Sequence, residues 1–267
     1  MVYFKKLPAE MDRIHCLLLL LLFLPLLNVS ASEDSAEIAT SASDSTSLLG
    51  QKASWLDSKY VKQSITPVTL ATTSLAIMAI PDLKYQIQAQ LNWNSSEKVN
   101  LYDDELRYVP MGAVALLSLV GVKGNHTILE EVAIGSLSYI LGDFIVYRTK
   151  LATHVTRPNP AWGNESFPSQ HTSIAFIGAT LLHREFGQIS PWISISGYSI
   201  ATWVAYARIA RNRHFLPDVL MGAAVGTLST NATFWVYDAL APKLKNRLSC
   251  SPRLTENGGE LSLCYQF

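Results

Sequence analysis

Long apolar segments separated by short polar stretches dominate the chain between residues 61 and 245. These segments are longer than typical strands and lack the strict alternation of a half-buried strand, so they are predicted to be helices. Stretches rich in Asn, Ser, Gly and Pro at residues 92–100 and 159–166 are predicted to be loops. The six predicted helices span Thr66–Ile80, Val109–Val122, Leu129–Arg148, Ser169–Arg184, Pro191–Ile209 and Pro217–Leu240. The pattern indicates an all-α domain over residues 61–245.

The first 31 residues have the pattern of a secretory signal peptide. Basic residues precede a leucine-rich run from Cys16 to Val29, and small residues follow at the positions that a signal peptidase reads, ending at Ala31. An uncleaved anchor is the alternative, but the run of about 14 apolar residues is shorter than the roughly 20 that span a bilayer. Residues 32–60 are polar and rich in Ser and Ala, which predicts a flexible lead-in.

The C-terminal residues 246–267 are predicted to form a small hairpin. Asn257-Gly258 is a strong turn signal, and residues 261–267 alternate in the manner of a strand. Cys250 and Cys264 lie on either side of that turn, and two cysteines in an exported protein predict a disulfide. The alternative is a pair of free thiols in a frayed tail.

Three uncharged stretches are long enough to span a membrane, namely Gln63–Pro81, Phe186–Ala207 and Val219–Tyr237. The third predicted helix is less suitable, because Asp143 interrupts it. The mean hydropathy of +0.18 lies between that of a soluble domain and that of a polytopic membrane protein. The uncharged stretches favour membrane association, and a water-soluble helical bundle is the alternative.

The overall charge of the chain is balanced, with 21 basic and 21 acidic residues. A protein without a basic excess cannot release the counterions that drive nucleic-acid binding, so no nucleic-acid partner is expected. The positive charges of interest are local and lie in the second half of the chain.

Three polar clusters interrupt the apolar pattern between residues 150 and 218. They are Lys150 with Arg157-Pro158, then Pro168-Ser169-Gln170-His171, then Arg208 with His214 and Asp218. Lys and Arg give charge-assisted hydrogen bonds to phosphoryl oxygens, so three cations at one point suit a tetrahedral dianion. Two histidines suit phosphoryl transfer without a metal, one as nucleophile and one as general acid. The clusters predict a phosphatase site that needs no cofactor.

In order and spacing, these clusters resemble the motifs of the type 2 phosphatidic acid phosphatase superfamily, which includes bacterial acid phosphatases and vanadium haloperoxidases. The family pattern is Lys, six residues, Arg-Pro; then Pro-Ser-Gly-His; then Ser-Arg, five residues, His, three residues, Asp. The first and third spacings are kept, whereas Gln170 replaces the usual Gly and Ala207 replaces the usual Ser. The resemblance covers roughly residues 100–240 and implies a six-helix bundle.

The resemblance also implies a role for each motif residue. His214 is expected to form a phosphohistidine intermediate, and Asp218 to accept a hydrogen bond from its other ring nitrogen. His171 is expected to protonate the leaving alkoxide and then to activate water. The groups expected to bind the phosphate are Lys150, Arg157, Arg208, the Ser169 hydroxyl and the backbone amides around Gln170.

The sequence therefore predicts a metal-independent phosphatase in the bacterial envelope, membrane-associated and with a periplasmic active site. The expected substrate is a phosphomonoester or pyrophosphate borne by a lipid: phosphatidate, phosphatidylglycerophosphate, a polyprenyl pyrophosphate or lipid A. One alternative is a soluble periplasmic acid phosphatase that acts broadly on small phosphomonoesters. A vanadate-dependent haloperoxidase is a second alternative. The third is a non-catalytic binder of lipid phosphates. The replacement of the usual Gly by Gln170 is the feature that would indicate it.

Overall fold

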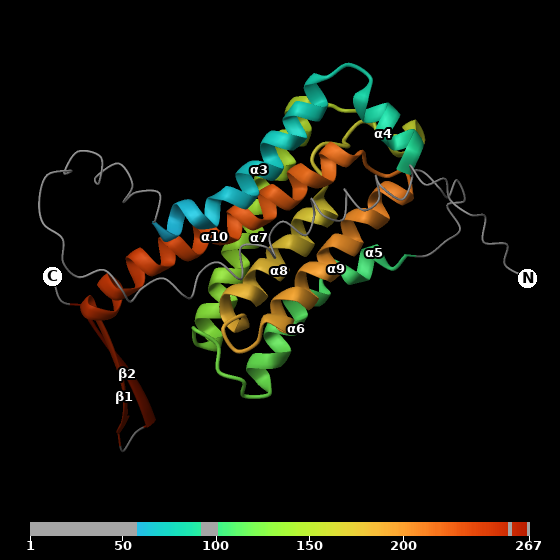
Figure 1. Ribbon diagram of the computed structural model, residues 1–267. Helices are drawn as coiled ribbons and strands as arrows, with labels where there is room; N and C mark the ends of the chain where they lie inside the picture. Colours follow the sequence, from blue (N-terminus) through green and yellow to red (C-terminus); the bar gives the residue numbers. More distant parts are fainter. Residues whose placement is uncertain (1–57, 92–100, 256–257, 266–267) are drawn as a thin grey trace, which may run out of the picture.

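The computed structural model describes residues 58–91, 101–255 and 258–265, with side chains up to Ala241. The predicted signal peptide, 1–31, and nearly all of the predicted lead-in, 32–60, lie outside this part. The described helices form one bundle, and a hairpin follows the end of its last helix (Figure 1). The helices are α3 (Lys59–Ala79), α4 (Leu83–Leu91), α5 (Asp103–Leu106), α6 (Val109–Leu119), α7 (Ile128–Thr153), η1 (Pro160–Trp162), α8 (Gln170–Phe186), α9 (Pro191–Ala210) and α10 (Leu216–Arg247).

The predicted all-α fold is confirmed, and each of the six predicted segments forms a helix, namely α3 and α6 to α10. The starts of α6 to α10 agree with the predicted starts to within one residue. Other boundaries differ more: α3 begins at Lys59, within the predicted lead-in, and α7 and α10 continue to Thr153 and Arg247. The short elements α4, α5 and η1 are not predicted by the apolar pattern, since none is long enough to show a helical period of its own.

The central helix of the bundle is α8. Almost all of its side chains are buried, and α6, α7, α9 and α10 pack around it (Figure 1). Between Thr172 and Leu182 its sequence is apolar or small on every side, as expected of a helix with no solvent-facing stripe. Because α8 begins at Gln170, the motif Pro168-Ser169-Gln170-His171 lies at the N-terminal end of the best-buried element.

Two glycines bring α10 unusually close to α8. A Cβ atom added at Gly222 would lie 2.5 Å from the carbonyl oxygen of Ser169, and Gly226 packs in the same way against the carbonyl of Ser173. Only a residue without a side chain permits this approach. At the start of α10 the backbone of Ser169 donates a hydrogen bond to the carbonyl of Asp218, at 2.9 Å. The second and third sequence motifs are thereby placed side by side.

Residues 248–265 form the expected C-terminal hairpin, in which β1 (Leu248–Thr255) pairs antiparallel with β2 (Gly258–Tyr265). In this register Cys250 lies opposite Leu263, and Cys264 lies opposite Ser249. The cysteine side chains lie outside the part of the chain whose side chains are described, so the disulfide between them stays a prediction.

Among the described helices, one segment, Leu216–Ala241 of α10, has the length and composition to cross a membrane. The buried share of its apolar window is 72%, and a core helix of a soluble protein passes the same test. The helices α3 and α4 pass it only together, across a bend of 106°. The predicted spanning stretch Phe186–Ala207, which contains most of α9, does not pass. Helix length alone is therefore weak support for membrane insertion.

Candidate active site

A pocket lies at the end of the bundle where α7 and α9 end and where α8 and α10 begin. Lys150 and Arg208 are in the last turns of α7 and α9, whereas His171 is in the first turn of α8 and His214 precedes α10. The pocket is lined by Asp143, Val146, Tyr147, Lys150, Arg157, Glu165, Gln170, His171, Arg208 and His214. All three predicted cations and both predicted histidines thus share one pocket.

Of the three cations, Lys150 and Arg208 are buried and Arg157 is half-buried, and they lie close enough to affect one another. Burial, followed by the charge of Arg157, lowers the pKa of Lys150 to about 8. Burial and then the neighbouring Arg208 lower the pKa of Arg157. Lys150 and Arg157 both donate to the carbonyl oxygen of Glu165. Because these positive charges destabilise one another, an anion bound among them would be strongly favoured.

His214 is fully enclosed, with only 2% of its surface exposed. Its Nδ1 lies 3.6 Å from Oδ2 of Asp218, which is longer than a hydrogen bond. The hydroxyl of Ser166 lies beside both groups, because it donates to Asp218 Oδ2 at 2.5 Å and lies 3.4 Å from His214 Nδ1. The backbone amide of Phe215 also donates to Asp218 Oδ2, at 2.8 Å. Burial lowers the pKa of His214 to about 4, although Asp218 acts to raise it.

The side chains of Ser169 and Gln170 are hydrogen-bonded to other protein groups. Ser169 is the fully buried N-cap of α8, where its hydroxyl oxygen accepts from the amide and the hydroxyl of Thr172. The side chain of Gln170 lines the pocket and donates from Nε2 to Oδ1 of Asp143, at 2.5 Å. In this arrangement the Gln170 amide group is directed to α7.

His171 has two partners at the same ring nitrogen. Its Nε2 lies 2.6 Å from Oδ1 of Asp104 and 2.8 Å from Nη1 of Arg107. Burial, and then the charge of Arg208, lowers the pKa of His171 to about 3, whereas the Asp104 carboxylate raises it. Both partners come from the segment that contains α5, which precedes all three sequence motifs.

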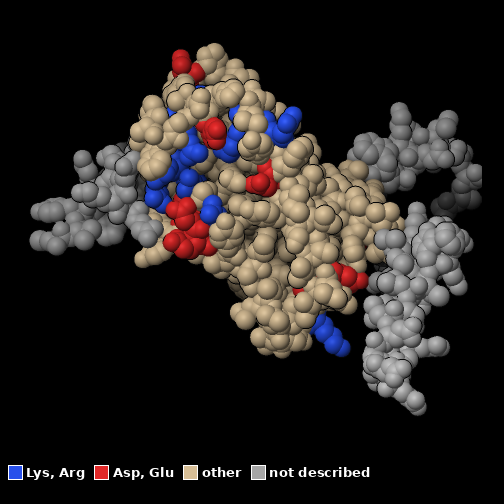
Figure 2. Space-filling view, turned by 180° about the vertical axis from the view of Figure 1, so that it is seen from behind, with Lys and Arg blue, Asp and Glu red and all other residues tan. Residues whose placement is uncertain are grey.

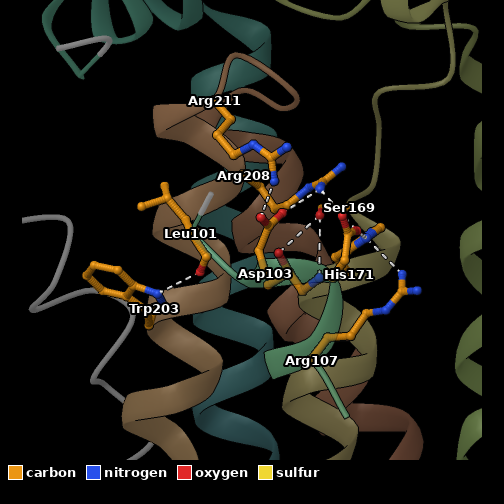
Figure 3. A network of polar contacts seen from close by, with 10 residues as sticks. Leu101, Asp103, Arg107, Ser169, His171, Trp203, Arg208 and Arg211 are labelled. Atoms are coloured by element: carbon orange, nitrogen blue, oxygen red, sulfur yellow. Dashed lines mark hydrogen bonds and ion pairs between the residues drawn. The ribbon is translucent and has the colours of Figure 1, made fainter. Parts of the chain in front are cut away.

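The α5 segment is attached to α9 by a buried ion-pair network (Figure 3). Asp103, which has no exposed surface, accepts from Arg208 Nη1 at 2.6 Å and also from Arg211. The carbonyl of Leu101 accepts from the indole nitrogen of Trp203, at 3.2 Å. Burial acts to raise the pKa of Asp103, but the positive charges of Arg208 and Arg211 stabilise its carboxylate. The pKa of Asp103 is therefore lowered.

The pocket therefore has polar neighbours that the motif pattern does not contain. They are Ser166, Asp103, Asp104, Arg107 and Asp143. One signal was present in the sequence: the acidic run Asp103-Asp104-Glu105 just before the uncharged segment that begins at Tyr108. Ser166 gives no such signal, because a serine in a loop is too common to be informative.

Comparison with known proteins gives three similarities. Residues 132–241 match the family model of the PAP2 superfamily. The chain is 31% identical over 228 residues to a lipid A 1-phosphatase from Porphyromonas gingivalis, a match that covers 84% of the chain and 50% of that protein. The chain thus spans about half the length of this curated relative. The crystal structure of LpxE from Aquifex aeolicus is similar with a TM-score of 0.45 and 23% identity, over 57% of this chain and 94% of that one.

The family match covers all three sequence motifs, since Lys150, the Pro168–His171 motif and the Arg208–Asp218 motif lie between residues 132 and 241. The cationic pocket is built from this same segment, with α7 to α10 as its walls. The helical segment 132–241, which holds the whole pocket-forming set of motifs, therefore matches the PAP2 superfamily.

Proposed function

We propose that this protein is a metal-independent phosphatase that hydrolyses a lipid-borne phosphomonoester through a phosphohistidine intermediate on His214. The observation that carries the proposal is the convergence of Lys150, Arg157 and Arg208 on one pocket that also holds His171 and His214. These three cations would bind a phosphoryl dianion and stabilise the charge that spreads over its equatorial oxygens in the transition state.

In the first step Nε2 of His214 attacks phosphorus. Nδ1 of that ring faces Ser166 and Asp218, which leaves Nε2 for the substrate. The N–P bond forms while the bond from phosphorus to the leaving oxygen breaks, and His171 gives its proton to that oxygen. The product alcohol leaves, and the phosphoryl group stays on His214.

In the second step water replaces His214 on phosphorus. His171, now neutral, takes a proton from the attacking water, and the N–P bond breaks as the new O–P bond forms. Inorganic phosphate leaves, and both histidines return to their starting protonation states. The cations hold the phosphoryl oxygens throughout, so His214 can remain fixed between the two steps.

A lipid-borne substrate is supported by the relative, whose name assigns it the 1-phosphate of lipid A. It is also supported by the apolar surface of α7, where large side chains are exposed at helical spacing along the helix. They are Leu129, Val132, Leu137, Ile140, Phe144, Tyr147 and Leu151. In Figure 2 the charged side chains gather near one end of the molecule, and much of the rest of that face is uncharged. A continuous apolar surface of this kind indicates contact with lipid or protein.

We therefore propose that the protein lies in or on the bacterial envelope membrane, with the pocket end facing the periplasm. Among the lipid substrates considered, the relative favours lipid A, and the others are phosphatidate, phosphatidylglycerophosphate and a polyprenyl pyrophosphate. A soluble, broad-specificity phosphatase would differ in one property, because it would stay in solution without detergent.

The experiment is phosphate release by the purified full-length chain, with and without excess EDTA. The panel contains lipid A, the other lipid phosphates and two water-soluble phosphomonoesters. We expect release from the lipids at rates that EDTA does not change, and no release by the His214→Ala variant.

Three results would contradict parts of the proposal. Loss of activity in EDTA would overturn the metal-independent mechanism. Equal rates on soluble and lipid substrates, with a chain that needs no detergent, would favour the acid phosphatase. Binding of lipid phosphates without release of phosphate would make the protein a binder.

A further inference from the structure

One ring nitrogen of His171, Nε2, contacts both an acidic and a basic side chain from the α5 segment. The Nε2 atom of an imidazole carries at most one proton, so it cannot be bound by Asp104 and by Arg107 in the same way. When Nε2 is protonated it donates to the Asp104 carboxylate, 2.6 Å away. When Nε2 is bare it accepts from Nη1 of Arg107, 2.8 Å away. Each protonation state of that nitrogen therefore has a partner.

The backbone that carries these partners is held firmly. Asp103, the residue before Asp104, is buried in ion pairs with Arg208 and Arg211. Helix α5 also contacts α6, α8 and α9. The position of Asp104 beside His171 is thus fixed by buried charges on its neighbour, although its own side chain is largely exposed.

We propose that Asp104 is a positioning residue for the general acid, and that Arg107 opposes it. Asp104 accepts the Nε2–H of His171, which leaves Nδ1 to give its proton to the leaving oxygen and later to take one from water. Asp104 would thus stabilise the charged imidazolium, whereas Arg107 would favour the neutral tautomer that carries its proton on Nδ1 and accepts at Nε2. This inference rests on the function proposed above, and neither residue belongs to the three sequence motifs.

Each charged neighbour of His171 shifts the pKa of the ring in a definite direction. Asp104 raises the pKa of His171, whereas burial, Arg208 and Arg107 lower it. The other charged or titratable groups in the pocket wall are Asp143, Lys150, Arg157, Glu165, Tyr147 and His214. A bound phosphate dianion would raise the pKa of His171 further and so prepare the ring to act as an acid. Removing the Asp104 charge should lower that pKa, and removing the Arg107 charge should raise it.

The test compares Asp104→Asn, Arg107→Gln and the control Glu105→Gln, which removes a charge from the same short helix. Each variant is assayed across pH on p-nitrophenyl phosphate and on octyl phosphate. An aryl oxide leaves without a proton, whereas an alkoxide needs one, so only the second substrate depends on the general acid.

For Asp104→Asn we expect the alkaline limb of kcat for octyl phosphate, which reports the enzyme with phosphate bound, to move down by about one pH unit. The rate on that limb should fall about tenfold, since one pKa unit is tenfold in the protonated fraction. The aryl rate should change by less than about threefold. Arg107→Gln should move the limb upward, Asp104→Glu should restore it, and Glu105→Gln should leave both rates and the limb unchanged.

Two results would overturn the inference. Equal losses on both substrates without movement of the limb would show that Asp104 only supports the fold. Higher activity of Asp104→Asn on both substrates would show that the carboxylate blocks the pocket.

Nitrogen NMR of labelled histidine gives a readout that does not require turnover, since the His171 titration itself should move down in Asp104→Asn and up in Arg107→Gln. An unmoved titration would refute the role of Asp104, whereas absent hydrolysis with a moved titration would refute only the phosphatase function.

Discussion

The two histidines of the pocket differ in how their surroundings are built. His214 is 2% exposed, and its carboxylate neighbour Asp218 follows it by four residues in the same motif. His171 is 17% exposed, and its carboxylate neighbour Asp104 is 67 residues away in the chain and 58% exposed. A nucleophile has to stay in line with phosphorus, which favours an enclosed ring. A proton donor has to exchange protons with substrate and water, which favours a ring that solvent can reach and that has a partly exposed carboxylate beside it.

The largest expected effect concerns the enclosed histidine. His214→Ala removes the nucleophile and therefore the reaction path, so we expect kcat to fall by at least about 10⁴-fold. Single-turnover phosphate release measures the loss, and circular dichroism checks that the helices remain. Retention of more than a few per cent of the activity would eliminate the phosphohistidine on His214.

The second effect concerns the more exposed histidine and depends on the substrate. His171→Ala should lower the rate on alkyl phosphates by about 10²-fold or more and the rate on aryl phosphates much less. Parallel assays of octyl and p-nitrophenyl phosphate measure the difference. If the two losses were equal, His171 would bind phosphate without transferring a proton, and the contrast between the two histidines would disappear.

A smaller effect is expected for the groups that orient His214. Asp218→Asn should lower kcat less than His214→Ala does, by a factor of about 10 to 100, because it disturbs the ring tautomer and leaves the nucleophile in place. Ser166→Ala should have a milder effect of the same kind, since its hydroxyl donates to Asp218 and lies beside His214. A wild-type rate for Asp218→Asn would remove that carboxylate from the mechanism.

The charge of Lys150 should limit activity at alkaline pH. Its pKa is lowered to about 8, so in the free enzyme the ammonium loses its proton as the pH rises through about 8 and phosphate binding weakens. We expect kcat/KM to decline above that pH in the wild type, and the decline to be absent in Lys150→Arg, whose guanidinium stays charged. A decline of the same shape in both proteins would assign it to another group.

The smallest expected effect is that of Gln170→Gly. The amide of Gln170 binds Asp143, so its loss should keep or slightly raise the activity on small phosphomonoesters and loosen the selection among substrates. Asp143→Asn is the matched control, since it alters the same contact from α7. A fall of more than about tenfold in kcat/KM, roughly 1.4 kcal/mol, would show instead that Gln170 is a phosphate ligand.

The features that sequence reasoning predicts well are those with a local pattern. The starts of α6 to α10 follow from apolar segments bounded by Pro, Gly and polar residues, and the candidate site residues follow from fixed motif spacings. Asp104 and Arg107 have no such pattern, because their partner is more than 60 positions away and only the fold brings them together. The direction of the Gln170 side chain is equally invisible, since it depends on the position of Asp143 on another helix.

The glycine contacts between α8 and α10 have a consequence for the tolerance of the chain to mutation. A methyl group at Gly222 would need space occupied by the Ser169 carbonyl, so even Gly222→Ala must force the helices apart. Such a change would separate His171 from His214 without altering any catalytic side chain. Loss-of-function substitutions in a random mutant library are therefore expected at two apparently featureless glycines as well as at the charged residues. Gly112, whose missing side chain faces open space, should accept the same substitution.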